Sequence, residues 1–89
     1  MDQHAFKARL EADGYTEIET KDLAPKPANE EHGHHFSVRG LVLAGAFIVR
    51  HDDRSVTYGP GQVFSVAQGV AHCEEVGPDG ARVIVGRKY

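Results

Sequence analysis

The sequence predicts an all-β sandwich or closed barrel preceded by one short helix. The hydrophobic period changes from helical to alternating after Gly14, and short turn signals divide the rest of the chain into brief segments of strand composition. With 89 residues the chain is long enough for one domain. We expect residues 1–14 to form the N-terminal helix and residues 15–89 the barrel of that single domain.

The N-terminal segment from Asp2 to Asp13 is expected to be helical. Asp2 can cap the first turn, and Gly14 suits the left-handed position that follows a helix. Phe6 and Leu10 are four residues apart and therefore share one face. A helix of about three turns is marginal by itself in water, so we expect this apolar face to pack on the rest of the domain.

Seven strands are expected after the helix. The first runs from Tyr15 to Asp22 and is followed by a loop from Leu23 to Asn29 that contains two prolines. The others are expected at His32 to Val38, Leu41 to Arg50, Ser55 to Tyr58, Gln62 to Ala67, Ala71 to Val76 and Ala81 to Arg87. The turns between them are predicted from HDDR at 51–54, GPG at 59–61, QG at 68–69 and GPDG at 77–80.

Charge and composition argue against several classes of partner. The net charge is −3, and the basic pair Arg87-Lys88 is not part of a longer cluster, which disfavours nucleic acid. No apolar stretch approaches the roughly 18 to 20 residues that cross a bilayer, and the N-terminus is not signal-like. We therefore expect a cytoplasmic protein that binds neither nucleic acid nor a membrane. A single cysteine, Cys73, excludes an internal disulfide.

Three histidines form the most informative pattern in the chain. His32 and His34 are two residues apart, and on a strand this spacing directs both side chains to one face, roughly 6.5 to 7 Å apart at Cα. His72 follows in another predicted strand. An imidazole from a neighbouring strand would complete a three-nitrogen site, and neutral imidazoles suit zinc, iron, nickel and copper.

These histidines belong to two spaced motifs. The first motif is His-x-His followed by a glutamate and a glycine, and here it is met by His32, His34 and Gly45, with Val38 where the glutamate belongs. The second motif has the pattern Gly, Pro, Gly, His, Asn, and here its positions hold Gly61, Ala67, Gly69, His72 and Val76. The spacing is matched throughout both motifs.

From residue 31 to residue 87 the chain therefore resembles a small single-domain cupin, of the cupin 2 conserved barrel type with an RmlC-like jelly roll. The resemblance implies a double-stranded β-helix, and His32, His34 and His72 would match the metal-binding imidazoles of its lumen. The metal would be a divalent transition metal, and Fe, Zn, Ni, Mn and Cu remain open. Val38 cannot supply the fourth ligand of the family, and losing that carboxylate favours anionic ligands.

Glu74 is a candidate for the missing carboxylate. It lies two residues after His72 and thus on the same strand face, where it can replace the family ligand or accept a hydrogen bond from an imidazole N–H. The alternative for the histidines is a barrel that keeps three imidazoles without metal, hydrogen-bonded to one another and to water. His4, His35 and His51 are expected at the surface.

Side chains alternate between the two faces of a strand, so apolar residues at even-numbered positions should face the lumen with the histidines and line the site. These are Phe36, Val38, Val42, Phe64, Val66 and Val76. Residues of the opposite parity, including Leu41 and Leu43, need cover from the helix or from a dimer interface. A homodimer is the usual arrangement in the family that the chain resembles.

Three classes of function remain open at this stage, and the third of them is a storage or scaffold barrel. The first is a metal-dependent enzyme acting on a small molecule, because three-histidine sites in the family resemble those of dioxygenases, and other cupins isomerise sugars or decarboxylate acids. No further acid or base at a clear catalytic spacing is visible. The second class is therefore a non-catalytic module that binds or senses a small molecule in the lumen.

Overall fold

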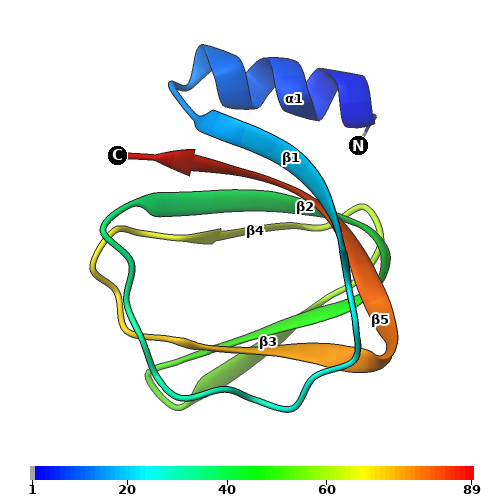
Figure 1. The fold of residues 1–89 in the computed structure, drawn as a ribbon, viewed down its shortest axis with the longest axis vertical. Helices are drawn as coiled ribbons and strands as arrows, with labels where there is room; N and C mark the ends of the chain where they lie inside the picture. The colour runs from blue at the N-terminus through cyan, green and yellow to red at the C-terminus, as the bar shows by residue number, and fades with distance from the viewer. Residues whose placement is uncertain (1) are drawn as a thin grey trace.

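Two long antiparallel strands are the inner strands of the sheet (Figure 1). The computed structural model describes residues 2–89, in the order α1 (Gln3–Ala12), β1 (Thr16–Leu23), β2 (Ser37–His51), β3 (Arg54–Tyr58), β4 (Val63–Val66) and β5 (Cys73–Lys88). β2 pairs with β5, β1 adds to the free edge of β5, and β3 and β4 add to β2. All these pairs are antiparallel. The all-β fold with one N-terminal helix is confirmed.

The helix begins and ends as its sequence predicts. The Asp2 carboxylate accepts hydrogen bonds from the backbone N–H groups of His4 at 2.6 Å and Ala5 at 3.2 Å, which satisfies two donors of the first turn. After the last turn, Gly14 adopts φ +86°, the left-handed conformation that glycine adopts without strain.

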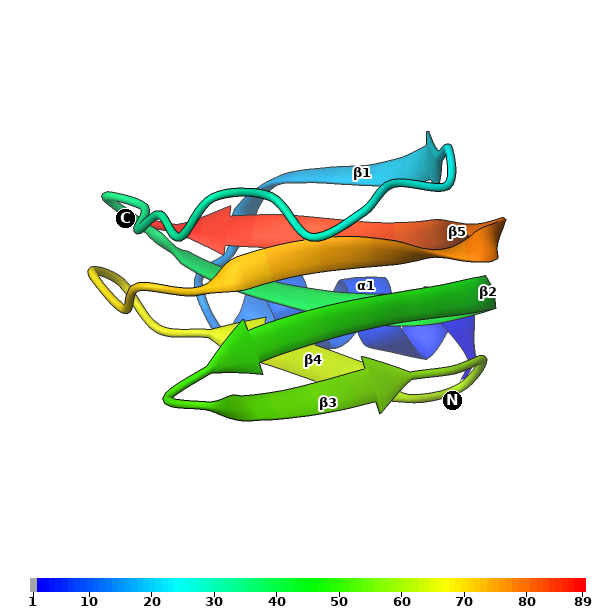
Figure 2. The same cartoon turned by 90° about the horizontal axis from the view of Figure 1, so that it is seen from below.

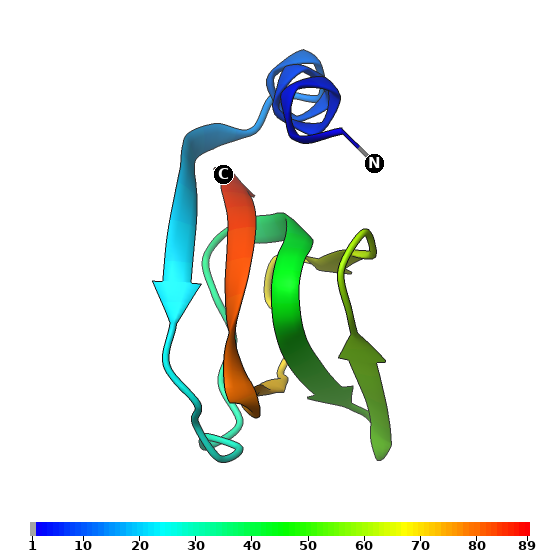
Figure 3. The same cartoon turned by 90° about the vertical axis from the view of Figure 1, so that its right-hand side faces the viewer.

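The apolar face of α1 covers one face of the β2–β5 sheet (Figure 3). Phe6 and Leu10 are buried against Leu41 of β2 and Ile84 of β5. The sequence left two possible covers for Leu41, the helix or a dimer interface, and in the structure the helix covers it. Among residues 2–89, no helix combines the length and apolar character that a membrane crossing requires.

The tight turn between β2 and β3 is also confirmed. His51 pairs with Arg54, so the connection has only two residues, Asp52 and Asp53, with φ of +49° and +62°. Two successive residues with positive φ match the twist of a hairpin, and aspartate tolerates this conformation better than most residues.

The turn predicted at GPDG is wrong, because β5 continues through it. Gly45 pairs with Ala81 and Phe47 pairs with Val76, so residues 77–80 of β5 lie opposite the single residue Ala46 of β2. The extra residues form a bulge, at which β5 bends sharply without reversing (Figure 1). The glycines and the proline of GPDG therefore mark a bend within one strand. From Cys73 onward, the strands predicted at Ala71 to Val76 and at Ala81 to Arg87 are both part of β5.

A similar correction applies at Gly40, which lies inside β2 and does not separate two strands. A Cβ atom at this position would lie 2.2 Å from Cζ of Phe64, so glycine is required because the ring packs directly on the backbone. Phe64 belongs to β4, which pairs with β2 here. Glycine is therefore needed at position 40 because the Phe64 side chain of β4 packs closely on β2.

Most of the strand expected at His32 to Val38 is instead part of an extended connection, residues 24–36, which we call the connecting segment. It runs beside the first half of β5 (Figure 2) and forms isolated bridges between Lys26 and Val76 and between His32 and His72. The backbone of Asn29 also donates to the Glu74 carbonyl at 3.1 Å. The connecting segment thus brings the first two histidines of the motif to the third.

The face of the sheet opposite α1 carries the lumen core. Val42 and Val66 are buried there, as their parity predicts, together with Phe47 and Val49 from the second half of β2. The register of β2 against β5 shifts between Val42 and Phe47. Because of this shift, even-numbered residues of β2 face the lumen before it and odd-numbered residues face the lumen after it.

Candidate metal centre

The three motif histidines and Glu74 converge at one end of the lumen. The ring centroids are 4.9 Å apart for His32 and His34, 4.5 Å for His32 and His72, and 5.1 Å for His34 and His72. One potential ligand atom from each of the four residues lies within 4.8 Å of the others. His4, His35 and His51 lie apart from this group and are exposed, as expected.

The backbone fixes these positions from two directions. His32 and His72 form a reciprocal pair, with N–H to carbonyl distances of 2.9 and 2.8 Å, so their side chains emerge side by side. The carbonyl of His34 accepts a hydrogen bond from the backbone N–H of Gly69 at 3.0 Å, which attaches it to the turn before β5. His72 is therefore placed immediately before β5, and His32 and His34 are placed by pairing of the connecting segment.

Hydrogen bonds to the backbone set the tautomers of two imidazoles. Nδ1 of His32 lies 3.0 Å from the carbonyl oxygen of Glu30, and Nδ1 of His72 lies 3.0 Å from that of Val70. A carbonyl oxygen only accepts, so each Nδ1 donates its hydrogen. In the neutral rings, Nε2 then carries a free lone pair, and this is the arrangement in which metal-binding histidines are usually held.

Both lone pairs face the carboxylate of Glu74. Its Oε2 lies 3.6 Å from Nε2 of His32, and its Oε1 lies 3.5 Å from Nε2 of His72. These distances exceed those of charge-assisted hydrogen bonds, which are about 2.7 to 2.9 Å. The spacing leaves room for a small cation among the ligand atoms, and the role of Glu74 as a ligand remains a prediction.

His72 carries the strongest sign of an unsatisfied site. Its side chain is 1% exposed, and its Nε2 atom has no hydrogen-bond partner among residues 2–89. A buried polar atom without a partner is costly, by about 1–3 kcal/mol, unless an ion or water satisfies it. Burial, followed by the nearby His72, holds the pKa of His34 below its ordinary value, which favours the neutral, metal-binding form. The residues present therefore fit a divalent transition metal.

One residue of this arrangement was missed by the sequence analysis. The side-chain oxygen of Asn29 accepts a hydrogen bond from the backbone N–H of Glu74 at 2.8 Å, in addition to the backbone bond between the same residues. Asn29 therefore holds the strand position from which Glu74 reaches the histidines. In the sequence it stood at the end of a proline-containing loop, and nothing local indicated its partner.

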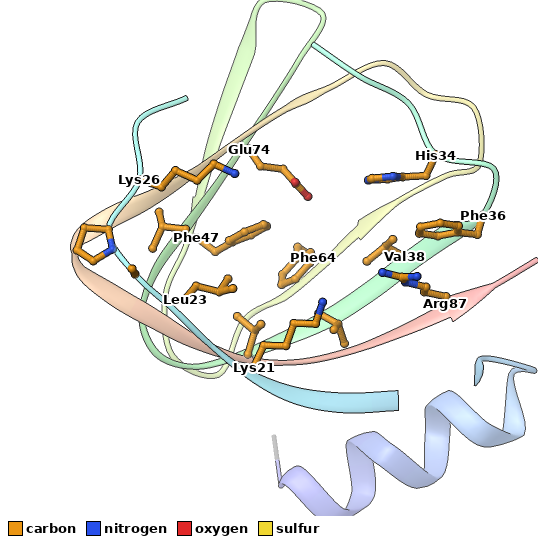
Figure 4. A pocket seen from close by; sticks show the side chains of 15 residues that line it. Lys21, Leu23, Lys26, His34, Phe36, Val38, Phe47, Phe64, Glu74 and Arg87 are labelled. Atoms are coloured by element: carbon orange, nitrogen blue, oxygen red, sulfur yellow. The ribbon is translucent and has the colours of Figure 1, made fainter. Parts of the chain in front are cut away.

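A cavity of about 440 Å³ opens beside the histidines (Figure 4). His34 and Glu74 lie on its wall, so the cavity adjoins the cluster directly. Most of the remaining wall is apolar and comes from four strands and the connecting segment. It includes Phe36, Val38, Phe47, Phe64, Val76, Val83 and Val85. Val38 thus faces the cavity at the position where the first motif would place glutamate.

Three cationic residues also line the cavity, and no motif of the sequence points to them as residues of a site. They are Lys21 of β1, Lys26 of the connecting segment and Arg87 of β5, which are remote in sequence and reach over the apolar wall from different sides (Figure 4). Their common location depends on the pairing of β1 with β5, which no local pattern reveals.

Searches against models of protein families and against curated proteins returned no match. Solved structures do match. A protein of unknown function from Rhizobium leguminosarum is 22% identical, with a TM-score of 0.72 over 80% of this chain and 67% of that one. A cupin-2 domain protein from Shewanella frigidimarina is 14% identical, with a TM-score of 0.68 over 81% of this chain and 69% of that one.

The polyketide cyclase RemF from Streptomyces resistomycificus matches as well, at 21% identity and a TM-score of 0.65 over 85% of this chain and 56% of that one. At these identities the likeness shows the fold. The chain has the fold of the small cupin 2 barrels, a double-stranded β-helix, as the two motifs predicted, and a short N-terminal helix precedes it.

Proposed function

We propose that this chain binds a divalent transition metal through His32, His34 and His72, with Glu74 as the fourth ligand, and that the ion acts on or helps to hold a small organic molecule in the adjoining cavity. The observation that carries the proposal is the buried Nε2 atom of His72, which has no partner among residues 2–89 and faces a carboxylate. A cation at this point would satisfy both groups.

The donor set is chemically suited to such an ion. Imidazole nitrogens favour zinc, iron, nickel and copper, and a single carboxylate lowers the net charge of the bound ion to +1. Glu74 comes from β5, whereas the first cupin motif would have placed its carboxylate at Val38 on β2. A carboxylate approaching from β5 leaves the Val38 side of the cavity apolar, which gives an organic ligand more room near the ion.

The residues of the proposed site have different roles. His72 is a fixed, buried ligand, whereas His34 and Glu74 contact both the cluster and the cavity. A molecule in the cavity would therefore meet the ion on the side of His34 and Glu74, with its apolar part on Phe47 and Phe64. A bound ion supplies Lewis-acid polarisation of such a molecule or a route to oxygen chemistry.

A non-catalytic binding or sensing role is the second candidate. It is favoured by the composition of the cavity wall, in which Glu74 and His34 are the described groups suited to proton transfer near neutral pH, and both belong to the cluster. If both coordinate an ion, none of these groups is left as an independent acid or base.

Isothermal titration of the metal-free protein with Zn²⁺, Ni²⁺ and Fe²⁺ tests the metal site, the iron titration being performed without oxygen. We expect one ion per chain, with binding reduced at least about tenfold by His34→Ala or by Glu74→Gln. The neighbouring exposed His35 and the adjacent Glu75 provide matched controls, and His35→Ala and Glu75→Gln should bind as the wild type does.

Thermal and chemical unfolding give a second readout of the same site. Free ion at a hundred times its dissociation constant should stabilise the folded chain by roughly 2.7 kcal/mol, and this gain should disappear in His72→Leu. Metal-free His72→Leu loses the unsatisfied Nε2 atom but also the hydrogen bond from Nδ1 to the Val70 carbonyl, so its stability should stay close to that of metal-free wild type. Equal, negligible metal binding by wild type and His34→Ala would reject the proposal.

Turnover separates the two candidate functions. An oxygenase reconstituted with Fe²⁺ should consume oxygen in the presence of an organic substrate, a Lewis-acid enzyme should convert its substrate without oxygen uptake, and either rate should fall with Glu74→Gln but not with Glu75→Gln. A binding module should be stabilised by the same molecule without turnover. Anomalous scattering at the convergence of the three imidazoles would identify the element that occupies the site.

A further inference from the structure

The cavity wall carries a positive charge in a chain that is negative overall. Lys21, Lys26 and Arg87 line it, and Glu74 is the only carboxylate among its described lining residues, which gives a formal charge of +2 before any ion is bound. The whole chain has a net charge of −3. A local excess of the opposite sign in an apolar concavity concentrates anions there.

These cations are not consumed by strong internal ion pairs. Lys21 lies 3.1 Å from Glu19, and Arg87 lies 3.7 Å from Glu17, but both glutamates are exposed, and pairs of this kind contribute little in water. Lys26 has no carboxylate within 4.0 Å in the part of the chain that the structure describes. An anion in the cavity can therefore compete with the weak partners of Lys21 and Arg87 and can bind Lys26 directly.

Arg87 is held in a defined position beside the histidine cluster. Its guanidinium carbon lies 4.5 Å from the centroid of the Phe36 ring, and the Phe36 ring stacks on His34 at 4.8 Å with an interplanar angle of 13°. Figure 4 shows the three side chains layered along one wall of the cavity. Stacking uses the face of the guanidinium and leaves its N–H edge available to a carboxylate.

We infer that the ligand of this cavity is a small organic acid with an apolar body, whose carboxylate is bound by Arg87 and Lys21 and whose body lies on Val38, Phe47 and Phe64. This inference rests on the proposed function only in taking the same cavity as the ligand site. The volume of about 440 Å³ is within the range of about 300 to 1,000 Å³ that is typical of small-molecule sites. Lys26, on the side of Glu74, adds to the attraction for a negative group (Figure 4).

Matched series of ligands test the charge preference. Hydrocinnamate, hydrocinnamamide and phenylpropylamine share one body, as do octanoate, octanamide and octylamine, and each would be titrated into protein freed of metal with EDTA. We expect each acid to bind about tenfold more tightly than its amide and the amines to bind most weakly. Amide chemical shifts should change at Val38, Val83 and Val85.

Variants locate the source of that preference. Lys21→Met and Arg87→Met should each weaken binding of the acids about three- to tenfold and leave the amides unchanged, whereas Arg87→Lys should retain most of the affinity. Lys7→Met on α1 and Arg50→Met on the outside of β2 change the net charge equally but do not line the cavity, so they serve as controls.

The inference would be overturned if acids and amides bound equally, if the control variants weakened the acids as much as the cavity variants did, or if neither acid bound at millimolar concentration. The metal proposal fails separately. A preference for acids in a protein that binds no metal would reject only the metal site, and metal binding without a preference for acids would reject only the ligand class.

Discussion

The two faces of the β2–β5 sheet carry apolar layers of different kinds. On one face, Leu41 and Ile84 are completely buried beneath the helix residues Phe6 and Leu10. On the other face, the lumen core includes Phe64 but also borders a cavity of about 440 Å³ and the histidine cluster. Close packing stabilises a fold, whereas a cavity gives up contacts. The comparison predicts that truncating a side chain in the sealed helix-side layer costs more stability than truncating one on the cavity wall.

The largest expected effect follows from emptying the helix-side layer. Leu41→Ala should lower the free energy of unfolding by about 2–5 kcal/mol, because the site is sealed and the lost side chain leaves a void. Val38→Ala, on the cavity wall, should lower it by only about 1 kcal/mol, since part of that side chain already faces open space. Urea denaturation measures both values, and equal losses would remove the distinction between the two faces.

An intermediate effect is expected from filling the lumen side at Gly40, the neighbour of Leu41 on the same strand. Gly40→Ala places a methyl group against the Phe64 ring and should destabilise the protein by about 1–3 kcal/mol. The displaced ring should also reduce the cavity and weaken ligand binding. In a Phe64→Leu background the same substitution should cost less, and an unchanged cost would show that the contact with the ring is not its cause.

The smallest expected effect concerns the junction between the two layers. Arg39 of β2 donates a hydrogen bond to the carboxylate of Asp13 at the end of α1, and this bond holds the pKa of Asp13 below its ordinary value of 3.8. A lowered carboxyl pKa contributes stability above the ordinary value, and that contribution is lost as the pH falls through the lowered one.

Asp13→Asn should therefore reduce the stability slightly near neutral pH and should match the wild type in strong acid. Thermal unfolding of the two proteins as a function of pH measures the difference. Asp53→Asn, in the exposed β2–β3 turn, is the matched control and should show no such pH-dependent gap. A gap that persists unchanged in acid would argue against the ion pair as its origin.

Local patterns predicted those parts of the molecule that local chemistry determines. The helix follows from the cap at Asp2 and the spacing of Phe6 and Leu10, and the hairpin follows from the two aspartates at its turn. The spacing of the motifs predicted the fold, and the His32, His34 and His72 rings lie together as that spacing anticipates. Metal binding by these rings remains a prediction.

The remaining features depend on pairing between distant segments. The sequence predicted a turn at GPDG and separate strands on either side of Gly40, but each place is one where another backbone or ring approaches a continuous strand. Likewise, Lys21 and Arg87 line one cavity only because β1 and β5 are neighbours. Register of this kind is set by contacts across the whole sheet, and no short window of sequence contains it.

The reciprocal backbone hydrogen bonds between His32 and His72 couple the docking of the connecting segment to the binding of any ion by the imidazoles. Opening of residues 24–36 would carry two of the four candidate ligands away from the other two, since His72 and Glu74 stay with β5. Because the two equilibria are linked, an ion bound by all four residues should protect the backbone amides of residues 24–36 from hydrogen exchange. Conversely, a substitution that weakens the docking of this segment should increase the rate at which the ion dissociates. The affinity of such a centre would then depend on the docking contacts of Asn29 as well as on the imidazoles themselves.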